Sequence, residues 1–218
     1  MAFLADDGSI VVLVAQPKER PTRSAKVHRI DDHLWLFTAG LSGDARTLAA
    51  HLRSSARQHK LSYGEPMTVE DAAQQSAAIQ HTLTRFGGAR PLGCTAIVLG
   101  RDPLHGETVG PSRLFRTDPG GGLEDCYFCC AGRDQDRLLS NLIDRYEKIR
   151  KRNLPEIIQK LVGYMLQGQN KSKTCLDVWV LRPDHRKRAK SDVTCFTEVS
   201  SADSLKTIAS YLESQSDA

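Results

Sequence analysis

Three cysteines close together form the densest group of side chains that could carry chemistry. Cys126 and Cys129 make a C-x-x-C pair and Cys130 follows at once, a spacing that can hold zinc or form a redox pair. Side chains of a strand alternate between its two faces, so a strand over 126–131 would turn Cys126 and Cys130 to one face and Cys129 to the other. No second pair of metal ligands stands at a suitable spacing. We therefore expect the thiols to diverge, and the sequence predicts neither a metal nor a cofactor.

A glycine-rich segment, Asp118–Gly122, has the composition of a phosphate-cradling loop. Such a loop needs its glycines to lead into the N-terminus of a helix, where backbone N–H groups point at the anion. Here they lead into Leu123-Glu124-Asp125 and a predicted strand. The context favours a hairpin turn.

The histidines and the basic run are weaker candidates. None of the seven histidines forms an H-x-x-x-H pair or has the carboxylate neighbours of a ligand set. Residues 182–190 hold five Lys or Arg and one Asp, which favours a solvated loop between two late strands. Nuclear import is a secondary interpretation, and RNA binding through the same cations is another.

Charge and composition exclude several classes of protein. The 218 residues hold 30 Lys and Arg against 26 Asp and Glu, and without residues 182–190 the two signs balance at 25 each. A nucleic-acid-binding body would need cations spread over a face. The longest apolar run, Ile10–Ala15, is too short for a membrane helix, and the first residues lack the features of a secretion signal. Six irregularly spaced cysteines indicate reduced thiols in the cytosol or nucleus.

Periodicity predicts strands in runs and helices in pairs. Two hairpins come first, then two amphipathic helices, the first of about four turns from Ala45 and the second with Thr68 as its cap and a buried stripe that ends at Phe86. Residues 40–42 end the preceding strand and offer the cap of the first helix. The predicted strands are Ala2–Ala5, Ile10–Gln16, Lys26–Ile30, Leu34–Ala39, Cys94–Leu99, Arg113–Thr117, Cys126–Ala131, Cys175–Leu181 and Val193–Thr197. Later helices are predicted over 138–149, over 154–165 behind an Asn153 cap, and over 205–212.

Such runs favour an α+β fold with antiparallel sheets and helix layers outside them. No linker is long enough to separate two domains. The sequence therefore predicts one domain over 1–218, with 182–192 as a basic surface loop insertion.

Five segments stand in an order that a known family shares. They are Lys26–Leu34 running on to Ala39–Arg46, Leu61–Pro66, Phe86–Cys94, Leu114–Gly121 and Cys130–Arg133. Together they resemble the α-type subunits of the 20S proteasome, over nearly the whole chain from about Ala2 to Leu212. The most specific match is Phe86–Cys94, FGGARPLGC, which is similar to the family's YGGVRPFG(V/C)S. The residues RPLGC in this segment favour the type α1 subunit, also called α6.

The resemblance implies a fold, a role and partners. Members have a four-layer αββα sandwich, the N-terminal-nucleophile hydrolase fold, which agrees with the predicted elements. An α-type subunit is a non-catalytic part of a heptameric ring that supports assembly, gates substrate entry and docks activators in ubiquitin- and ATP-dependent protein degradation. The implied partners are other α subunits, β-ring subunits and regulatory particles, without nucleic acid or membrane, in cytoplasm and nucleus. The family's upstream helix and gate-forming tail have no match, so we expect both to be absent.

The catalytic β-type relatives are the alternative. They attack peptides with a processed terminal Thr, whose own amine is the base, and a supporting Lys. Here Ala2 and Phe3 occupy that strand, and cleavage before Ser9 or Thr22 would delete a core strand. The sequence therefore predicts no catalytic residue.

The resemblance also implies a binding site. Lys26 aligns with a family lysine that lines a pocket between neighbouring α subunits and pairs with the C-terminal carboxylate of activators. Gly40 and Leu41 align with the floor of that pocket. An ammonium suits the task, because it holds a carboxylate without bidentate geometry. An ordinary lysine at a strand end is the alternative.

Overall fold

The computed structural model describes residues 1–17, 26–102, 110–167, 174–182, 192–196, 205–208 and 210. The elements in order are β1 (Ala2–Leu4), β2 (Ile10–Pro17), β3 (Val27–Arg29), β4 (Leu34–Gly40), α1 (Ser42–Tyr63), α2 (Val69–Arg85), β5 (Cys94–Arg101), β6 (Ser112–Thr117), β7 (Leu123–Asp125), β8 (Phe128–Cys129), α3 (Gln135–Ile143), α4 (Tyr146–Ile149), α5 (Leu154–Leu166), β9 (Thr174–Arg182) and β10 (Asp192–Phe196). Residues 205–208 and 210 are helical. Thr22, residues 183–191 and residues 211–218 lie outside the described residues.

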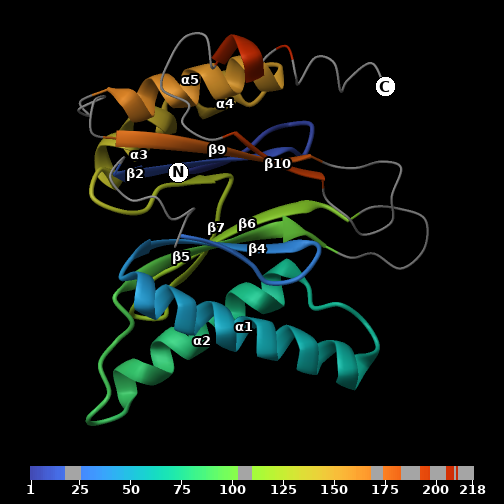
Figure 1. Cartoon of the computed structure of the whole chain (residues 1–218), viewed down its shortest axis with the longest axis vertical. Helices are drawn as coiled ribbons and strands as arrows, with labels where there is room; N and C mark the ends of the chain where they lie inside the picture. Colours follow the sequence, from blue (N-terminus) through green and yellow to red (C-terminus); the bar gives the residue numbers. More distant parts are fainter. Residues whose placement is uncertain are drawn as a thin grey trace.

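The strands form two antiparallel sheets, and helices cover the outer face of each. One sheet has the order β10-β9-β2-β1-β8 and the other β3-β4-β5-β6-β7. Helices α1 and α2 lie on the second sheet, and α3, α4 and α5 lie on the first (Figure 1). The predicted four-layer αββα sandwich with antiparallel sheets is confirmed.

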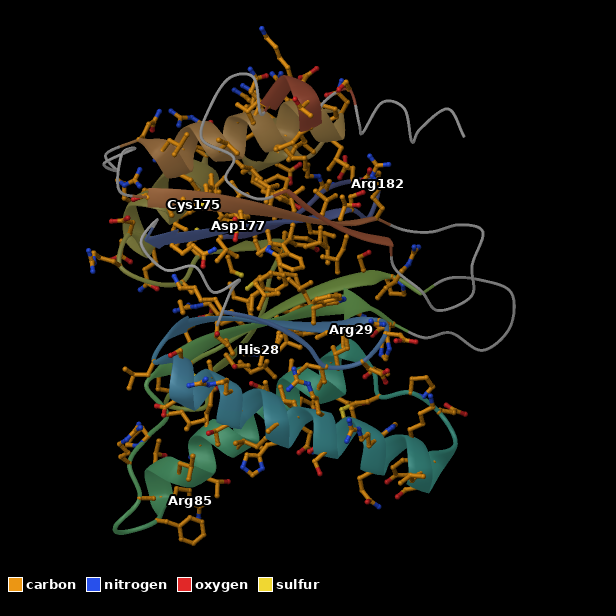
Figure 2. The ribbon with its side chains drawn as sticks, viewed as in Figure 1. His28, Arg29, Arg85, Cys175, Asp177 and Arg182 are labelled. Carbon is orange, nitrogen blue, oxygen red and sulfur yellow. The ribbon has the colours of Figure 1, made fainter. Side chains whose placement is uncertain are left out.

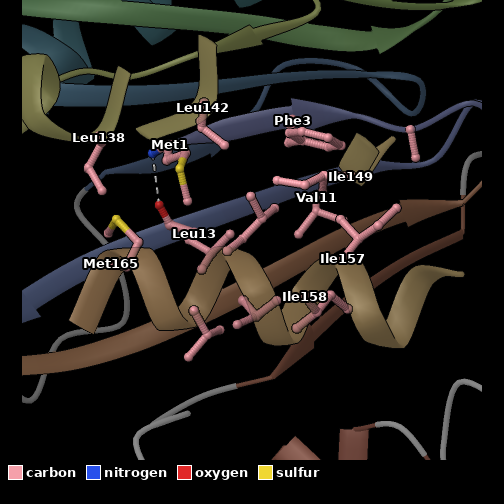
Figure 3. Packing of buried hydrophobic residues seen from close by; sticks show 14 of the residues in the cluster. Met1, Phe3, Val11, Leu13, Leu138, Leu142, Ile149, Ile157, Ile158 and Met165 are labelled. Atoms are coloured by element: carbon pink, nitrogen blue, oxygen red, sulfur yellow. Dashed lines mark hydrogen bonds between the residues drawn. The ribbon is translucent and has the colours of Figure 1, made fainter. Parts of the chain in front are cut away.

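Strand β2 shows why the sheets stack in this way. Its run Ile10–Val14 is apolar at every position, as expected for a strand that is covered on both faces. Val11 and Leu13 point to the core under α5, where Ile157 and Ile158 also lie (Figure 3). The alternate residues Ile10, Val12 and Val14 point to the core between the sheets. One strand thus contributes to two of the three cores.

The two predicted hairpins are confirmed, and they fall in different sheets. In the first, Ala2 pairs with Val12, and its turn is closed by the Ala5 N–H, which donates to the Ser9 carbonyl at 2.9 Å. Gly8 has a φ of 79° in that turn, a value that glycine adopts without strain. In the second hairpin, Val27 pairs with Phe37.

Local signals set most helix ends, with two exceptions. Thr68 caps α2 by accepting the Asp71 N–H at 3.0 Å, and Asn153 caps α5 in the same way, so both predicted caps are confirmed. The cap predicted within residues 40–42 falls at Leu41, which makes no side-chain capping hydrogen bond. The predicted burial of Phe86 is wrong. Helix α2 ends at Arg85, the backbone of Phe86 is extended, and its side chain is 64% exposed.

The predicted strand Cys126–Ala131 is confirmed only at Phe128–Cys129, because the chain changes sheets just before them. Strand β7 pairs with β6 in one sheet and β8 pairs with β1 in the other, and the chain bends at Tyr127 between them. The predicted turn at Asp118 is confirmed. Its carboxylate Oδ1 accepts the N–H groups of Gly120 at 2.8 Å and Gly122 at 3.0 Å. No helix in the described part of the chain is long and apolar enough to cross a membrane.

Candidate functional site

Lys26 lies directly before β3 and reaches across the sandwich. Its Nζ donates to the carbonyl of Ala15 on β2, in the opposite sheet, at 2.7 Å. Its own carbonyl accepts the Thr38 N–H at 2.8 Å, which fixes the residue beside β4. The side chain is half-buried. Lys26 therefore joins the two sheets at the end where β4 runs towards Gly40.

Gly40 and Leu41 form a corner between β4 and α1. Gly40 has a φ of 132°, and a Cβ there would collide with the Gly93 carbonyl oxygen and lie 2.8 Å from Cys94 Cα. The Leu41 N–H donates to that same carbonyl at 2.9 Å, while the Leu41 side chain is 56% exposed. Glycine is thus required at position 40 by both backbone geometry and close packing.

A bidentate ion pair holds this corner in place. Arg90 Nη1 and Nη2 donate to the two carboxylate oxygens of Asp44 at 2.7 and 2.8 Å. The Gly93 N–H adds a third bond to Asp44 at 2.7 Å. The Arg90 hydrogen bonds, followed by the one from Gly93, lower the pKa of Asp44 to about 2. We call Asp44, Arg90 and Gly93 the corner clasp.

The clasp connects two segments that the sequence analysis treated as separate motifs. Asp44 lies in Ala39–Arg46 and Arg90 lies in Phe86–Cys94, 46 positions further on. The sequence shows an acidic residue in one motif and a basic residue in the other. No local pattern, however, indicates that these two side chains form an ion pair. The structure therefore brings Gly40 and Leu41 onto Gly93, while the hydrogen bonds described for Lys26 run to β2 and β4.

The family assignment follows from a comparison that spans most of these elements. A family model for "Proteasome subunit" matches residues 2–181, from β1 to the end of β9. The chain belongs to the proteasome subunit family.

Relatives of this proteasome-family chain include proteins named as alpha subunits. The chain is 34% identical over 128 residues to "Proteasome subunit alpha" of Methanoculleus marisnigri, covering 59% of the chain and 51% of that protein. It is 36% identical over 123 residues to the protein of the same name in Methanococcus maripaludis, covering 56% and 45%. It is 29% identical over 170 residues to "Proteasome subunit alpha type-7" of Solanum lycopersicum, covering 78% and 63%. The chain spans about half the length of the curated relatives it matches.

Strand β1 and the turn after it bear on the catalytic alternative, which needs a nucleophile at the start of a strand. Ser9 lies in the β1–β2 turn, where its Oγ donates to Asp7 Oδ2 at 2.9 Å and its exposed fraction is 1%. Strand β1 lies between β2 and β8, and Ala2 and Phe3 are fully buried. Cleavage before Ser9 would therefore remove β1, which lies between two other strands of its sheet.

The prediction that the C-x-x-C thiols diverge is wrong. Cys126 and Cys129 both lie against the core between the sheets, whereas Cys130 belongs to the core under α5. The bend at Tyr127 breaks the alternation of a strand, so the first two thiols lie against the same core. Among the described residues, no group of three or more His, Cys, Asp or Glu is arranged to hold a metal ion.

A buried carboxylate on β9 was not anticipated. Asp177 is 3% exposed and accepts the Gln16 Nε2–H at 2.6 Å (Figure 2). Cys175 Sγ donates to its other oxygen at 3.8 Å. Gln16 lies on β2, which pairs with β9, so the hydrogen bond from Gln16 to Asp177 joins these two strands through their side chains.

The predicted basic loop lies mostly outside the described residues. Arg182 ends β9 and Asp192 begins β10, and the two are paired across the sheet (Figure 2). The remaining cations of the run fall in residues 183–191. The description of 182–192 as a surface insertion stays a prediction.

Proposed function

We propose that the chain is a non-catalytic structural subunit of a proteasome α ring. The supporting observation is its 29 to 36% identity to proteins named as proteasome alpha subunits, with a family match from β1 through β9. In this role it packs beside other α subunits, contacts the β ring, and helps to gate substrate entry and dock activators. The process it serves is ubiquitin- and ATP-dependent protein degradation.

The α1–α2 layer supports contact with partner subunits. It exposes three large apolar side chains: Leu61 at 81%, Tyr63 at 72% and Phe86 at 64%. Exposed apolar side chains of this size are typical of surfaces that a partner covers. In this proposal the α1–α2 layer is the face that contacts the β ring.

One pair of experiments separates the structural role from the catalytic alternative. Native mass spectrometry of the endogenous assembly is expected to find the chain with six related subunits and seven catalytic partners. The purified chain alone is expected not to cleave fluorogenic peptides. Peptide cleavage by the isolated chain that disappears in Ser9→Ala would contradict the proposal.

The activator pocket at Lys26, Gly40 and Leu41 is part of this proposal. Lys26 places a cation at the end of the sandwich where the Gly40–Leu41 corner exposes an apolar side chain. A carboxylate beside an apolar side chain is the chemistry of a C-terminal peptide. A neighbouring subunit supplies the other wall of the pocket.

A peptide pair tests the pocket in the purified assembly. Lys26→Ala is expected to weaken binding of an activator-derived peptide with a free C-terminal carboxylate, and Lys60→Ala on α1 serves as the control. The amidated peptide is expected to bind weakly to all three assemblies, because it lacks the charge. Equal binding of the free-carboxylate peptide to wild type and to Lys26→Ala would contradict the assignment of Lys26 to the pocket.

Ring position and location are the finer parts of the proposal. The segment Arg90–Cys94 supports a type α1 (α6) position, which cross-linking of the ring tests by identifying the two lateral neighbours. Cytoplasm and nucleus are the proposed compartments. Neutralising the cations of 186–190 is expected to lower the nuclear fraction of the tagged chain if the run is an import signal, and to leave ring incorporation unchanged.

A further inference from the structure

Two thiols lie where the chain passes from one sheet to the other. The Cys126 N–H donates to the Leu114 carbonyl on β6 at 2.9 Å, and the Tyr127 carbonyl accepts the Leu4 N–H on β1 at 2.8 Å. Each sheet thus fixes one side of the crossing. Cys126 and Cys129, on either side of the bend at Tyr127, both pack against the core between the sheets.

The pair opens onto a cavity of about 130 Å³. Its lining includes both thiols, the cation Arg116 and the carboxylates Glu124 and Asp136. Among the cysteines whose side chains are described, Cys126 is the one that is not buried, and Cys129 directly behind it is 2% exposed. A small molecule in the cavity would therefore meet Cys126 first, with charged groups of both signs beside it.

The surroundings make the two thiols unequal. The hydrogen bond from Cys129 lowers the pKa of Cys126, and Arg116 acts in the same direction, while partial burial, Glu124 and Asp125 oppose them. The same hydrogen bond and complete burial raise the pKa of Cys129 well above its usual value. A thiolate is the attacking species in thiol–disulfide exchange. Cys126 is thus suited to attack first, and Cys129 to attack second.

We propose that Cys126 and Cys129 form a reversible redox pair that is oxidised by a low-molecular-weight disulfide derived from an amino acid or short peptide. Two points of geometry carry this inference: both thiols line one cavity and pack against the same core, and charged groups stand beside Cys126 in that cavity. A zwitterionic disulfide complements a lining with one cation and two carboxylates. The role is additional to a structural function in a ring and does not depend on it.

The reaction balances in two exchange steps. The Cys126 thiolate attacks one sulfur of the small disulfide, its S–S bond breaks, and the released thiolate takes a proton from water. Cys129 then loses its proton to solvent and attacks Cys126 Sγ, which forms the Cys126–Cys129 bond and releases the second small thiol. The protein loses two protons and two electrons, and the small disulfide gains them and becomes two thiols. Closure of this bond brings the two sulfurs to the disulfide bond length of about 2.05 Å.

Mass spectrometry of the full chain tests the proposal. The reduced chain is incubated with oxidised glutathione, quenched and treated with N-ethylmaleimide, and the peptide 117–133 is fragmented. We expect wild type to lose two hydrogens and two alkylatable thiols, with the bond between Cys126 and Cys129 and no retained glutathione. A lasting glutathione adduct on wild-type Cys126, or a bond that includes Cys130, would overturn the proposal.

Three variants assign the two roles. In Cys129→Ser the mixed disulfide should accumulate on Cys126, because no second thiol resolves it. In Cys126→Ser no glutathione should be retained on Cys129, which is buried. Cys130→Ser is the matched control and should still form the Cys126–Cys129 bond. Equal labelling of Cys126 and Cys129 in these single variants would contradict the division of roles.

A comparison with unfolded wild type keeps the test decisive where a variant does not fold. The same reaction is run in concentrated urea, where the hydrogen bond and the cavity are lost. We expect the folded chain to form the single Cys126–Cys129 bond at least several-fold faster than the unfolded chain, which should carry mixed disulfides on many cysteines. Equal rates and the same products in both states would show that the fold does not create the redox pair.

Discussion

The side chain of Asp44 fixes the geometry of the Gly40–Leu41 corner, although Asp44 itself lies in the first turn of α1. It accepts two hydrogen bonds from Arg90 and one from Gly93, and Gly93 in turn holds the backbone of Leu41. Charge-assisted bidentate pairs of this kind are stronger and more directional than neutral hydrogen bonds. The exposed position of Leu41 is therefore set by a carboxylate in the next turn of the chain.

Replacing Asp44 gives a prediction with a defined pH dependence. Asp44→Asn is expected to lower Tm at pH 7 more than Asp32→Asn, because Asp32 pairs with Arg29 at the exposed surface. The pKa of Asp44 is about 2 in the folded chain, below its ordinary value of about 3.9, so its stabilisation is fully present above about pH 4.

As the pH falls from about 4 towards 2, Asp44 becomes protonated and the Tm gap between wild type and Asp44→Asn should close. Thermal unfolding of both chains over a pH series measures this gap directly, since effects common to both cancel. A gap that stays constant down to pH 2 would count against the clasp.

Two glycines three positions apart should respond to alanine in opposite ways. Gly40→Ala is expected to cost about 2 kcal/mol or more, because its positive φ disfavours a side chain and the added Cβ meets the backbone of Gly93. Gly43→Ala in the first turn of α1 meets nothing within 4 Å and should be neutral or stabilise by up to about 1 kcal/mol. Denaturant unfolding of both variants checks the contrast. A neutral Gly40→Ala would show that the corner can relax.

At the scale of elements, helix α2 is the case in which local sequence and structure agree. Thr68 caps it, and Asp71 accepts the Thr68 hydroxyl at 2.7 Å in return. Its stripe of Val69, Ala72 and Ala73 packs under the sheet that β5 and β6 share. The apolar spacing and the cap were both legible in the sequence, because each depends on residues three or four positions apart.

The cap of α2 therefore gives a prediction with a control in the same helix. Thr68→Ala is expected to destabilise the chain by about 1 kcal/mol, since the Asp71 N–H loses its acceptor. Thr82→Ala removes an exposed threonine from the last turns of α2 and should be neutral or stabilise by a few tenths of a kcal/mol. Equilibrium unfolding in urea measures both. Equal losses would mean that general helix propensity, rather than the cap, governs this end.

At the scale of the whole molecule, the contact between the sheets has a built-in reporter. The chain has two tryptophans, Trp35 on β4 and Trp179 on β9, and their ring centroids lie 5.8 Å apart across the two sheets. Their fluorescence therefore reports the separation of the sheets. Far-UV circular dichroism reports the strands and helices themselves.

Shortening a side chain between the sheets should shift both signals together. Leu99→Ala is expected to cost 2 to 5 kcal/mol as an order-of-magnitude range, because Leu99 is fully buried beside Leu114 in the core between the sheets. Leu61→Ala, at a side chain that is 81% exposed, should stay within about 0.5 kcal/mol of wild type. Chemical unfolding followed by both signals is the measurement. A fluorescence midpoint that moves without the dichroism midpoint would show that the sheets separate before they unfold.

The sequence by itself determined the features that repeat over short distances and the segments that match a family. These include the apolar run of β2, the hairpin turns, the caps at Thr68 and Asn153, and the four-layer fold that the resemblance implied. Each rests on residues within one strand or one helical turn, or on motifs whose order is preserved.

Only the tertiary structure decided which distant residues meet. It joined Asp44 to Arg90, placed Cys126 and Cys129 against the same core, and left Phe86 in solvent. The ion pair joins residues 46 positions apart, and the two thiols share a core because the chain leaves one sheet and enters the other at Tyr127. Periodicity describes a segment that keeps one geometry, so it could not anticipate the places where that geometry changes.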